Sequence, residues 1–217
     1  MIEAAEARRF ILDNTSILSP PHVPELRLHL ADEAHDLWHR TEEQLGEIGL
    51  PPPFWAFAWA GGQGLARYVL DNPQILAGKH VLDFASGSGL VGIAAMMAGA
   101  KSVTCADVDP FSAEAAGLNA KLNNAELSVV TGDLVGSEIA ADILLAGDVF
   151  YDREFAERLI PWFETLAASG TKVLIGDPGR SYVPKNRLAK LASHDVPVTR
   201  ALEEAEVKHT TIWRYGP

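Results

Sequence analysis

Over residues 79–217, short apolar runs rich in β-branched side chains alternate with longer runs that have the composition of helices. The short runs predict strands at 80–84, 102–106, 127–130, 142–146 and 172–175. The longer runs predict helices at 91–98, 113–122 and 153–168. Strands that alternate with helices build βαβ units on a parallel sheet. Two last strands, at 196–202 and 208–215, have no helix between them, so the pattern predicts an α/β fold with a doubly wound, mostly parallel seven-stranded sheet and an antiparallel closing hairpin.

The first fifty residues have a different pattern, which predicts a helical N-terminal extension. Residues 3–12 have the composition of a short helix, and prolines interrupt residues 14–24. The apolar positions of residues 32–50 lie among charges, as in an amphipathic helix or a lid. Three consecutive prolines at 51–53 mark a boundary. We therefore divide the chain into an extension, 1–50, and one α/β domain, 51–217.

The charge of the chain narrows the class of partner. Its 217 residues include 29 acidic and 18 basic side chains, which gives a formal net charge of −11, and no stripe of Lys and Arg offsets it. Such a surface repels phosphate backbones, so we expect no nucleic-acid partner. A cationic partner, such as a lysine-bearing protein surface, fits better, although acidity can also serve solubility alone.

The single cysteine and the N-terminal sequence limit the cellular compartments and the metal sites to be considered. Cys105 allows no disulfide within the chain and no cysteine-based zinc site, and the histidine spacing does not indicate a metal. The stretch at 1–10 carries two acids and no long apolar run, so we expect neither a signal peptide nor a membrane span. The expectation is a monomeric cytoplasmic protein without a metal, in a bacterial cell rather than a mitochondrial matrix.

The most informative segment is VLDFASGSGLVG, at 81–92, where a predicted strand runs into small residues and then into a helix. Gly87, Gly89 and Gly92 match the G-x-G-x-x-G pattern, whose glycines let a cofactor lie against the backbone. Asp107 follows at the end of the next strand, where a ribose-binding acid is expected. Nicotinamide-dependent dehydrogenases share this pattern, so that class of enzyme stays open at this point.

Asp83 favours S-adenosylmethionine over a dinucleotide as the cofactor. Its carboxylate lies inside the predicted strand, four residues before the first glycine. There it could meet the ammonium group of S-adenosylmethionine, whereas it would repel a pyrophosphate. The alternative role is that of a buried acid that caps the loop.

Three segments, VLDFASGSG, VTCADVDP and GDVFYD, resemble those of the seven-stranded class I methyltransferases, which have a Rossmann-like sheet. The stretch from Asp148 to Tyr151 is similar to the D-x-x-Y signature of the family 16 protein-lysine methyltransferases. Two further segments, at 54–73 and 174–180, are similar to those of the electron transfer flavoprotein β-subunit lysine methyltransferases. The resemblance covers roughly residues 51–217, and it departs at Ala60, where relatives carry proline.

The resemblance implies an enzyme that transfers methyl groups from S-adenosylmethionine to lysine ε-amines, with S-adenosylhomocysteine as the product and the electron transfer flavoprotein β subunit as the substrate. Because Asp148 ends the fourth strand at the edge where doubly wound sheets bind ligands, we expect it to hydrogen-bond and orient the lysine ammonium, with Tyr151 offering the cation an aromatic face. A helix N-cap is the alternative role for Asp148, and an ordinary turn acid is the alternative for Asp133, which the resemblance places against the adenine. The expected cofactor-binding residues are Trp59, Gly62, Asp83, Ser86, Gly87, Gly89, Asp107, Val108, Asp133, Leu134 and Asp148.

Two segments outside the glycine loop complete the predicted site. Trp55 and Trp59 are expected in a loop that covers the methionine end of the cofactor, with contacts from residues 61–63. Core packing is the alternative for both tryptophans. Arg180 follows the fifth strand, where it could contact an acidic patch on the substrate or form a surface ion pair.

Other functions remain open from the sequence. Ribosomal protein L11 methyltransferases share the segment around Asp107 but carry an asparagine motif at the fourth strand, where this chain has DVFY. The alternative is therefore a class I methyltransferase for a ribosomal protein, of the L11 or L7/L12 type, or for a small molecule. A dehydrogenase, or a module that binds a nucleotide without chemistry, is the other class.

Overall fold

The computed structural model describes residues 3–31, 52–199 and 205–216. The helix or lid predicted at 32–50 lies outside the described residues. In the described part of the chain, no helix combines the length and the apolar character that crossing a membrane requires.

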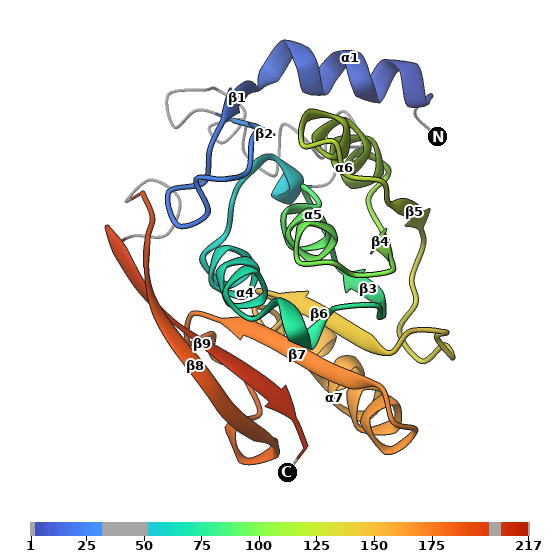
Figure 1. Cartoon of the computed structure of the whole chain (residues 1–217), viewed down its shortest axis with the longest axis vertical. Helices are drawn as coiled ribbons and strands as arrows, with labels where there is room; N and C mark the ends of the chain where they lie inside the picture. Colours follow the sequence, from blue (N-terminus) through green and yellow to red (C-terminus); the bar gives the residue numbers. More distant parts are fainter. Residues whose placement is uncertain (1–2, 32–51, 200–204, 217) are drawn as a thin grey trace.

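A seven-stranded mixed sheet forms the centre of the molecule, in the order β5-β4-β3-β6-β7-β9-β8 (Figure 1). The strands from β5 to β7 run parallel, β9 is antiparallel to β7, and β8 is antiparallel to β9. This arrangement confirms the predicted doubly wound sheet with its antiparallel closing pair. The bounds are β3 His80–Phe84, β4 Ser102–Asp107, β5 Ser128–Thr131, β6 Ile143–Gly147, β7 Lys172–Asp177, β8 Leu188–Pro197 and β9 Val207–Tyr215.

Helices cover both faces of the sheet, and those longer than one turn near it are α4 Ala60–Asp71, α5 Leu90–Met97, α6 Pro110–Leu122 and α7 Arg153–Ala168. The first three pack on one face and α7 packs on the other (Figure 1). Leu145 and Leu174 belong to the core under α4 and α5, whereas their neighbours Leu144 and Ile175 belong to the core under α7. Side chains alternate between the two faces of a strand, so burial on both faces explains why these strands are apolar almost throughout.

Short polar signals fix where α6 and α7 begin. The Asp109 carboxylate accepts the N–H of Phe111 at 2.9 Å, directly before a proline in the first turn of α6. Asp152 caps α7 in the same way, accepting the N–H of Phe155 at 2.8 Å. Single-turn 3-10 helices lie at η1 Phe54–Ala56, η2 Pro73–Ile75 and η3 Lys185–Arg187.

The N-terminal segment is more than a helix. α1 (Ala4–Asn14) packs against α6, and β1 (Ser16–Leu18) pairs antiparallel with β2 (Leu28–Leu30) in a separate two-stranded sheet (Figure 1). Leu26 and Leu28 are fully buried in the core that also contains α4 and α5. This part of the extension therefore contributes to the core of the α/β domain.

Two elements differ from their predictions. Residues 61–63, expected to contribute contacts to the covering loop of Trp55 and Trp59, lie in the first turn of α4, whose glycines lower helix propensity but allow a close approach to the sheet. A Cβ added at Gly61 would lie 2.4 Å from the carbonyl oxygen of Gly176. The strand expected at 196–202 is β8, which runs over 188–197, and residues 200–202 lie outside the described ranges.

Candidate functional site

Acidic side chains end or follow four neighbouring parallel strands at the carboxyl edge of the sheet. Asp83 lies one residue before the end of β3, Asp107 ends β4, Asp148 directly follows β6, and Asp177 ends β7. In the β6–β7 pair, residue 147 stands opposite residue 176, so Asp148 and Asp177 leave adjacent strands at the same level. Ligands of doubly wound sheets bind at this edge.

The glycine loop closes on the acid at the end of β4. The Gly87 N–H donates to Asp107 Oδ2 at 2.9 Å, and the Asp109 N–H donates to Asp107 Oδ1 at 3.0 Å. Ser86 is fixed to the same strand through its N–H, which donates to the Ala106 carbonyl at 3.1 Å. Gly87 has a φ of +50°, which side-chain-bearing residues rarely adopt. The predicted Gly87 and Asp107 are thus brought together.

Asp83 is buried, with 1% of its surface exposed, beneath this loop. Its Oδ2 accepts the N–H of Gly92 in α5 at 2.7 Å and lies 3.7 Å from Cys105 Sγ. Burial raises the pKa of this carboxyl to about 8. These contacts match the loop-capping role, and contact between Asp83 and a cofactor ammonium stays a prediction.

The residues expected around the adenine lie at the rim of the edge. Val108 is 67% exposed. Asp133 is half exposed, pairs with Arg158, and accepts the Val135 N–H at 3.0 Å. Leu134 packs against the core under α7. The structure places these three residues near strand ends, and their roles toward a cofactor stay predictions.

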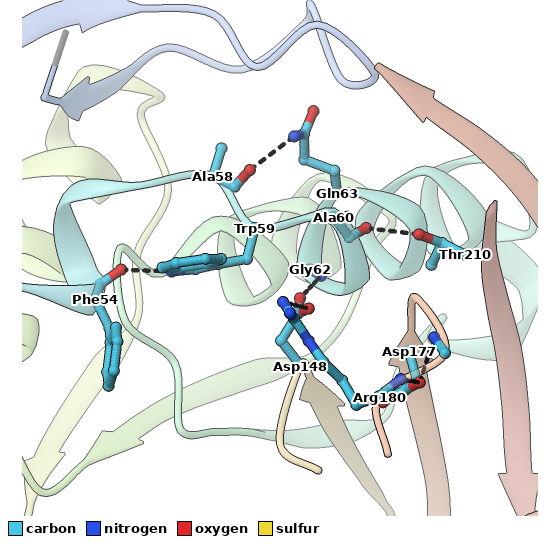
Figure 2. A network of polar contacts seen from close by, with 11 residues as sticks. Phe54, Ala58, Trp59, Ala60, Gly62, Gln63, Asp148, Asp177, Arg180 and Thr210 are labelled. Carbon is cyan, nitrogen blue, oxygen red and sulfur yellow. Dashed lines mark hydrogen bonds and ion pairs between the residues drawn. The ribbon is translucent and has the colours of Figure 1, made fainter. Parts of the chain in front are cut away.

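Asp148 is held by two partners from distant segments (Figure 2). Its Oδ2 accepts the Gly62 N–H at 2.9 Å, and its Oδ1 accepts Arg180 Nη2 at 2.9 Å. Its φ is +58°, an uncommon conformation for a residue with a side chain. Because the side-chain cap of α7 is Asp152, the helix-cap alternative for Asp148 does not hold.

Backbone-to-backbone packing places the Gly62 N–H within reach of Asp148. A Cβ at Gly61 would lie 2.4 Å from Asp148 Oδ2, and one at Gly147 would lie 2.8 Å from the Gly62 Cα. A Cβ at Gly176 would lie 2.1 Å from the Gly61 carbonyl oxygen. Only glycine fits at these three places, so the first turn of α4 rests directly on β6 and β7.

A tight turn after β7 presents Arg180. Asp177 Oδ1 accepts the N–H groups of Gly179 and Arg180 at 2.7 and 2.8 Å (Figure 2). Burial raises the pKa of Asp177 above its usual range. The Arg180 guanidinium carbon lies 5.9 Å from the centre of the Trp59 ring. Arg180 therefore forms an ion pair, as one of its two predicted roles required, but its partner lies within the site.

An aromatic wall borders this ion pair. The Trp59 indole N–H donates to the Phe54 carbonyl at 2.9 Å, and the Phe54 ring lies 5.7 Å from that of Tyr151. Tyr151 is half exposed, and partial burial raises the pKa of its hydroxyl. The structure thus groups the predicted Trp59, Gly62, Asp148 and Tyr151 on the β6–β7 side of the edge.

Two residues of the predicted covering loop have structural roles instead. Trp55 is buried and stacks on Phe111 with ring centres 6.0 Å apart, as the core alternative required. Gln63 is also buried, and its amide joins the Ala58 carbonyl at 2.7 Å to the His22 N–H at 3.1 Å. Within the described ranges, no cluster of three or more His, Cys, Asp or Glu side chains is arranged to hold a metal ion.

Sequence reasoning missed the Asp148–Arg180 pair and the turn acid Asp177. The segment GDPGR was singled out, but its partner was not. A signal existed: both acids directly follow glycines, Gly147 and Gly176, that come immediately after the predicted strands at 142–146 and 172–175.

Comparisons with known proteins identify the family of the chain. The family model of ribosomal protein L11 methyltransferase (PrmA) matches residues 66–150. The chain is 40% identical over 217 residues to the electron transfer flavoprotein beta subunit lysine methyltransferase of Xenopus laevis, covering 97% of this chain and 87% of that protein. The human protein of the same description is 33% identical over 227 residues, covering 98% of this chain and 83% of its own length.

Solved structures show the same fold at low identity. Ribosomal protein L11 methylase from Lactobacillus delbrueckii subsp. bulgaricus is 19% identical with a TM-score of 0.52, covering 74% of this chain and 81% of that one. Magnesium protoporphyrin IX methyltransferase from Synechocystis PCC 6803, solved with S-adenosylmethionine bound, is 16% identical with a TM-score of 0.51, covering 70% of this chain and 78% of that one.

Proposed function

The chain belongs to the family of electron transfer flavoprotein beta subunit lysine methyltransferases, and from this premise we propose that its substrate is the β subunit of an electron transfer flavoprotein. It is an S-adenosylmethionine-dependent protein-lysine N-methyltransferase, with S-adenosylhomocysteine as the product. The observation that carries the substrate is the likeness to the Xenopus laevis enzyme along nearly the whole of both chains.

The β3–β4 side of the edge suits S-adenosylmethionine. This cofactor carries two positive groups, a sulfonium and an ammonium, and this side of the edge presents the carboxylate of Asp107. The positive φ values of Gly87 and Gly89 bend the loop so that its backbone borders the edge. We assign Asp107 to the ribose hydroxyls and the exposed Val108 to one face of the adenine.

The β6–β7 side suits the lysine. Bound S-adenosylmethionine supplies an electrophilic methyl group. The lysine nitrogen lone pair forms the new N–C bond while the C–S electrons stay on sulfur, and the methylated ammonium then releases a proton to solvent. We assign Asp148 to orient the ε-amine by accepting one of its N–H groups. Tyr151 and Phe54 line the approach with aromatic faces. Holding the lysine nitrogen in line with the methyl group supplies much of the rate acceleration of methyl transfer.

A ribosomal protein is the second candidate substrate. The match of residues 66–150 to the L11 methyltransferase model favours it, but that match omits the turn containing Arg180 and the first turn of α4. The predicted cytoplasmic location and monomeric state, and the absence of a nucleic-acid partner, stay predictions.

The direct test uses the purified chain, radiolabelled S-adenosylmethionine and recombinant electron transfer flavoprotein, with ribosomal protein L11 in a parallel reaction. We expect methylated lysine on the β subunit by mass spectrometry, and we expect Asp148→Asn to abolish it. Absence of transfer to the flavoprotein, despite confirmed binding of S-adenosylhomocysteine, would refute the proposed substrate.

A further inference from the structure

The acid assigned to orient lysine is already paired with a cation. Asp148 Oδ1 and Arg180 Nη2 are 2.9 Å apart, and the two side chains are only 11% and 24% exposed. The arginine is fixed at both ends, because its backbone N–H donates to Asp177 and its guanidinium lies over Trp59. Burial and fixed geometry distinguish this ion pair from exposed pairs, which contribute little.

An unpaired carboxylate at this place would oppose methyl transfer. A nearby negative charge stabilises the lysine ammonium and raises its pKa. The ordinary lysine pKa is about 10.4, so the amine is mostly protonated at neutral pH, and a protonated amine has no lone pair. Each further unit of increase would reduce the neutral fraction about tenfold.

We propose that Arg180 is a positioning residue that acts through Asp148, cancelling the carboxylate charge while leaving it a hydrogen-bond acceptor for a neutral lysine ε-amine. This inference rests on the proposed function, because it concerns the acceptor of the same site. A carboxylate has about four lone-pair positions. Within the described ranges, Gly62 and Arg180 each donate one hydrogen bond to it, and the carboxylate with its charge cancelled can orient an amine without holding it as an ammonium.

Other charged groups lie on the elements that border the pair. Asp177 lies at the end of β7, with Lys185 near enough to affect it. Tyr151 and Asp152 follow β6. The negative charges of Asp152 and of Asp107, which ends β4, help to raise the pKa of Tyr151. The first turn of α4 contributes backbone N–H groups and no acidic side chain. Among these described groups the acids outnumber the one base, Lys185, so loss of Arg180 would shift the local field toward a protonated lysine.

The first test is Arg180→Met, followed by kcat and KM for the protein substrate between about pH 6 and 10. We expect the rising limb of kcat to move up by about one pH unit, with kcat at pH 7 about tenfold lower and KM unchanged or lower. Arg180→Lys keeps the charge and should restore most of the wild-type profile. An unmoved pH profile, or a loss expressed only as a higher KM, would overturn the inference.

A second test needs no methyl transfer. The probe is n-butylamine, which is a butylammonium ion at pH 7, and its affinity is measured by NMR titration with S-adenosylhomocysteine bound. Arg180→Met should bind it about tenfold or more tightly than the wild type, and the Asp148→Asn, Arg180→Met double variant should lose that gain. Equal affinity in the wild type and Arg180→Met would overturn the inference.

The matched control is Arg9→Met, which removes an exposed arginine paired with Asp13 on α1. It should behave as wild type in both tests. The two proposals can also fail separately. If the wild type does not methylate the flavoprotein but the butylammonium series behaves as expected, the substrate is wrong and the role of Arg180 stands.

Discussion

On the β3–β4 side of the sheet edge, Asp83 and Asp107 accept hydrogen bonds from backbone N–H groups of the segment that contains them, whereas on the β6–β7 side Asp148 also pairs with a cation. The first side is built from one continuous stretch, 81–109, and within the described ranges its Asp107 carboxylate accepts hydrogen bonds from the backbone N–H groups of Gly87 and Asp109. The second is assembled from three separate segments and balances its charge. An acidic surface suits a cationic cofactor. A surface on which a cation balances the carboxylate suits a lysine nitrogen that must be neutral to react.

Asp148→Asn should have the largest effect, because it breaks the β6–β7 side alone. We expect kcat to fall about 10²–10⁴-fold, as for loss of a group that orients a proton-bearing nucleophile. The affinity for S-adenosylhomocysteine, measured by calorimetry, should fall less than about tenfold. Equal losses in kcat and in cofactor affinity would assign Asp148 to the cofactor instead.

Gly61→Ala should break the contact that joins α4 to that side. The added methyl would meet Asp148 Oδ2 and the Gly176 carbonyl oxygen, each at 2.4 Å, and we expect the free energy of unfolding to fall by about 3 kcal/mol. Gly62→Ala is the matched control for stability, because its methyl would meet only Leu90 and Val91 at 3.7 and 3.8 Å. Urea unfolding measures both, and equal losses would contradict the described packing.

Asp107→Asn should weaken only the β3–β4 side. It replaces a carboxylate that accepts the hydrogen bond from the Gly87 N–H and, in our assignment, hydrogen bonds from the ribose hydroxyls. We expect about tenfold weaker binding of S-adenosylhomocysteine by calorimetry. At saturating S-adenosylmethionine, kcat should stay within about threefold of wild type. A collapse of kcat at saturation would mean that the two sides do not act separately.

Asp83→Asn sharpens the comparison through pH. The folded-state pKa of Asp83 is about 8, against about 3.9 for an unperturbed aspartate. Between these values the folded chain holds one more proton than the unfolded chain, so the free energy of unfolding falls as pH rises, by at most about 1.4 kcal/mol per pH unit. This favourable contribution is fully present below about pH 4 and is lost progressively toward pH 8.

In the Asp83→Asn variant, the unfolding free energy should not show this decrease with rising pH. Urea unfolding of both proteins at pH 5, 6, 7 and 8 gives the difference in unfolding free energy, with roughly those pH values chosen to span the interval. A difference that does not change with pH would show that Asp83 is ionised in the folded chain.

Features set by local sequence were predictable. β3 and α7 have the predicted bounds, because apolar runs and the cap at Asp152 specify them within a few residues. Gly87 and Asp107, both predicted to belong to the cofactor site, lie together because one loop between successive βα units joins them. The family resemblance added the residues of the D-x-x-Y segment, which spacing alone would not single out.

Features set by tertiary contact were not. The glycines at 61, 62 and 64 lower the helix propensity of α4, so its sequence resembles that of a loop. The reason for glycine at 61 is the close packing of the helix backbone on β6 and β7, which local sequence does not reveal. The bounds of β8 depend on its pairing with β9 at the sheet edge. Asp148 and Arg180 are 32 positions apart in the chain, and only the register of β6 on β7 makes them partners.

The meeting of α4 with β6 and β7 through bare backbone restricts how such a site can evolve. A side chain at Gly61, Gly147 or Gly176 would push the helix away from the sheet, so almost no substitution is tolerated at these positions. New acceptor specificity must therefore arise at the rim, where Phe54 and Tyr151 are exposed. A protein engineer who wanted to retarget the enzyme would randomise the rim and leave the glycines untouched.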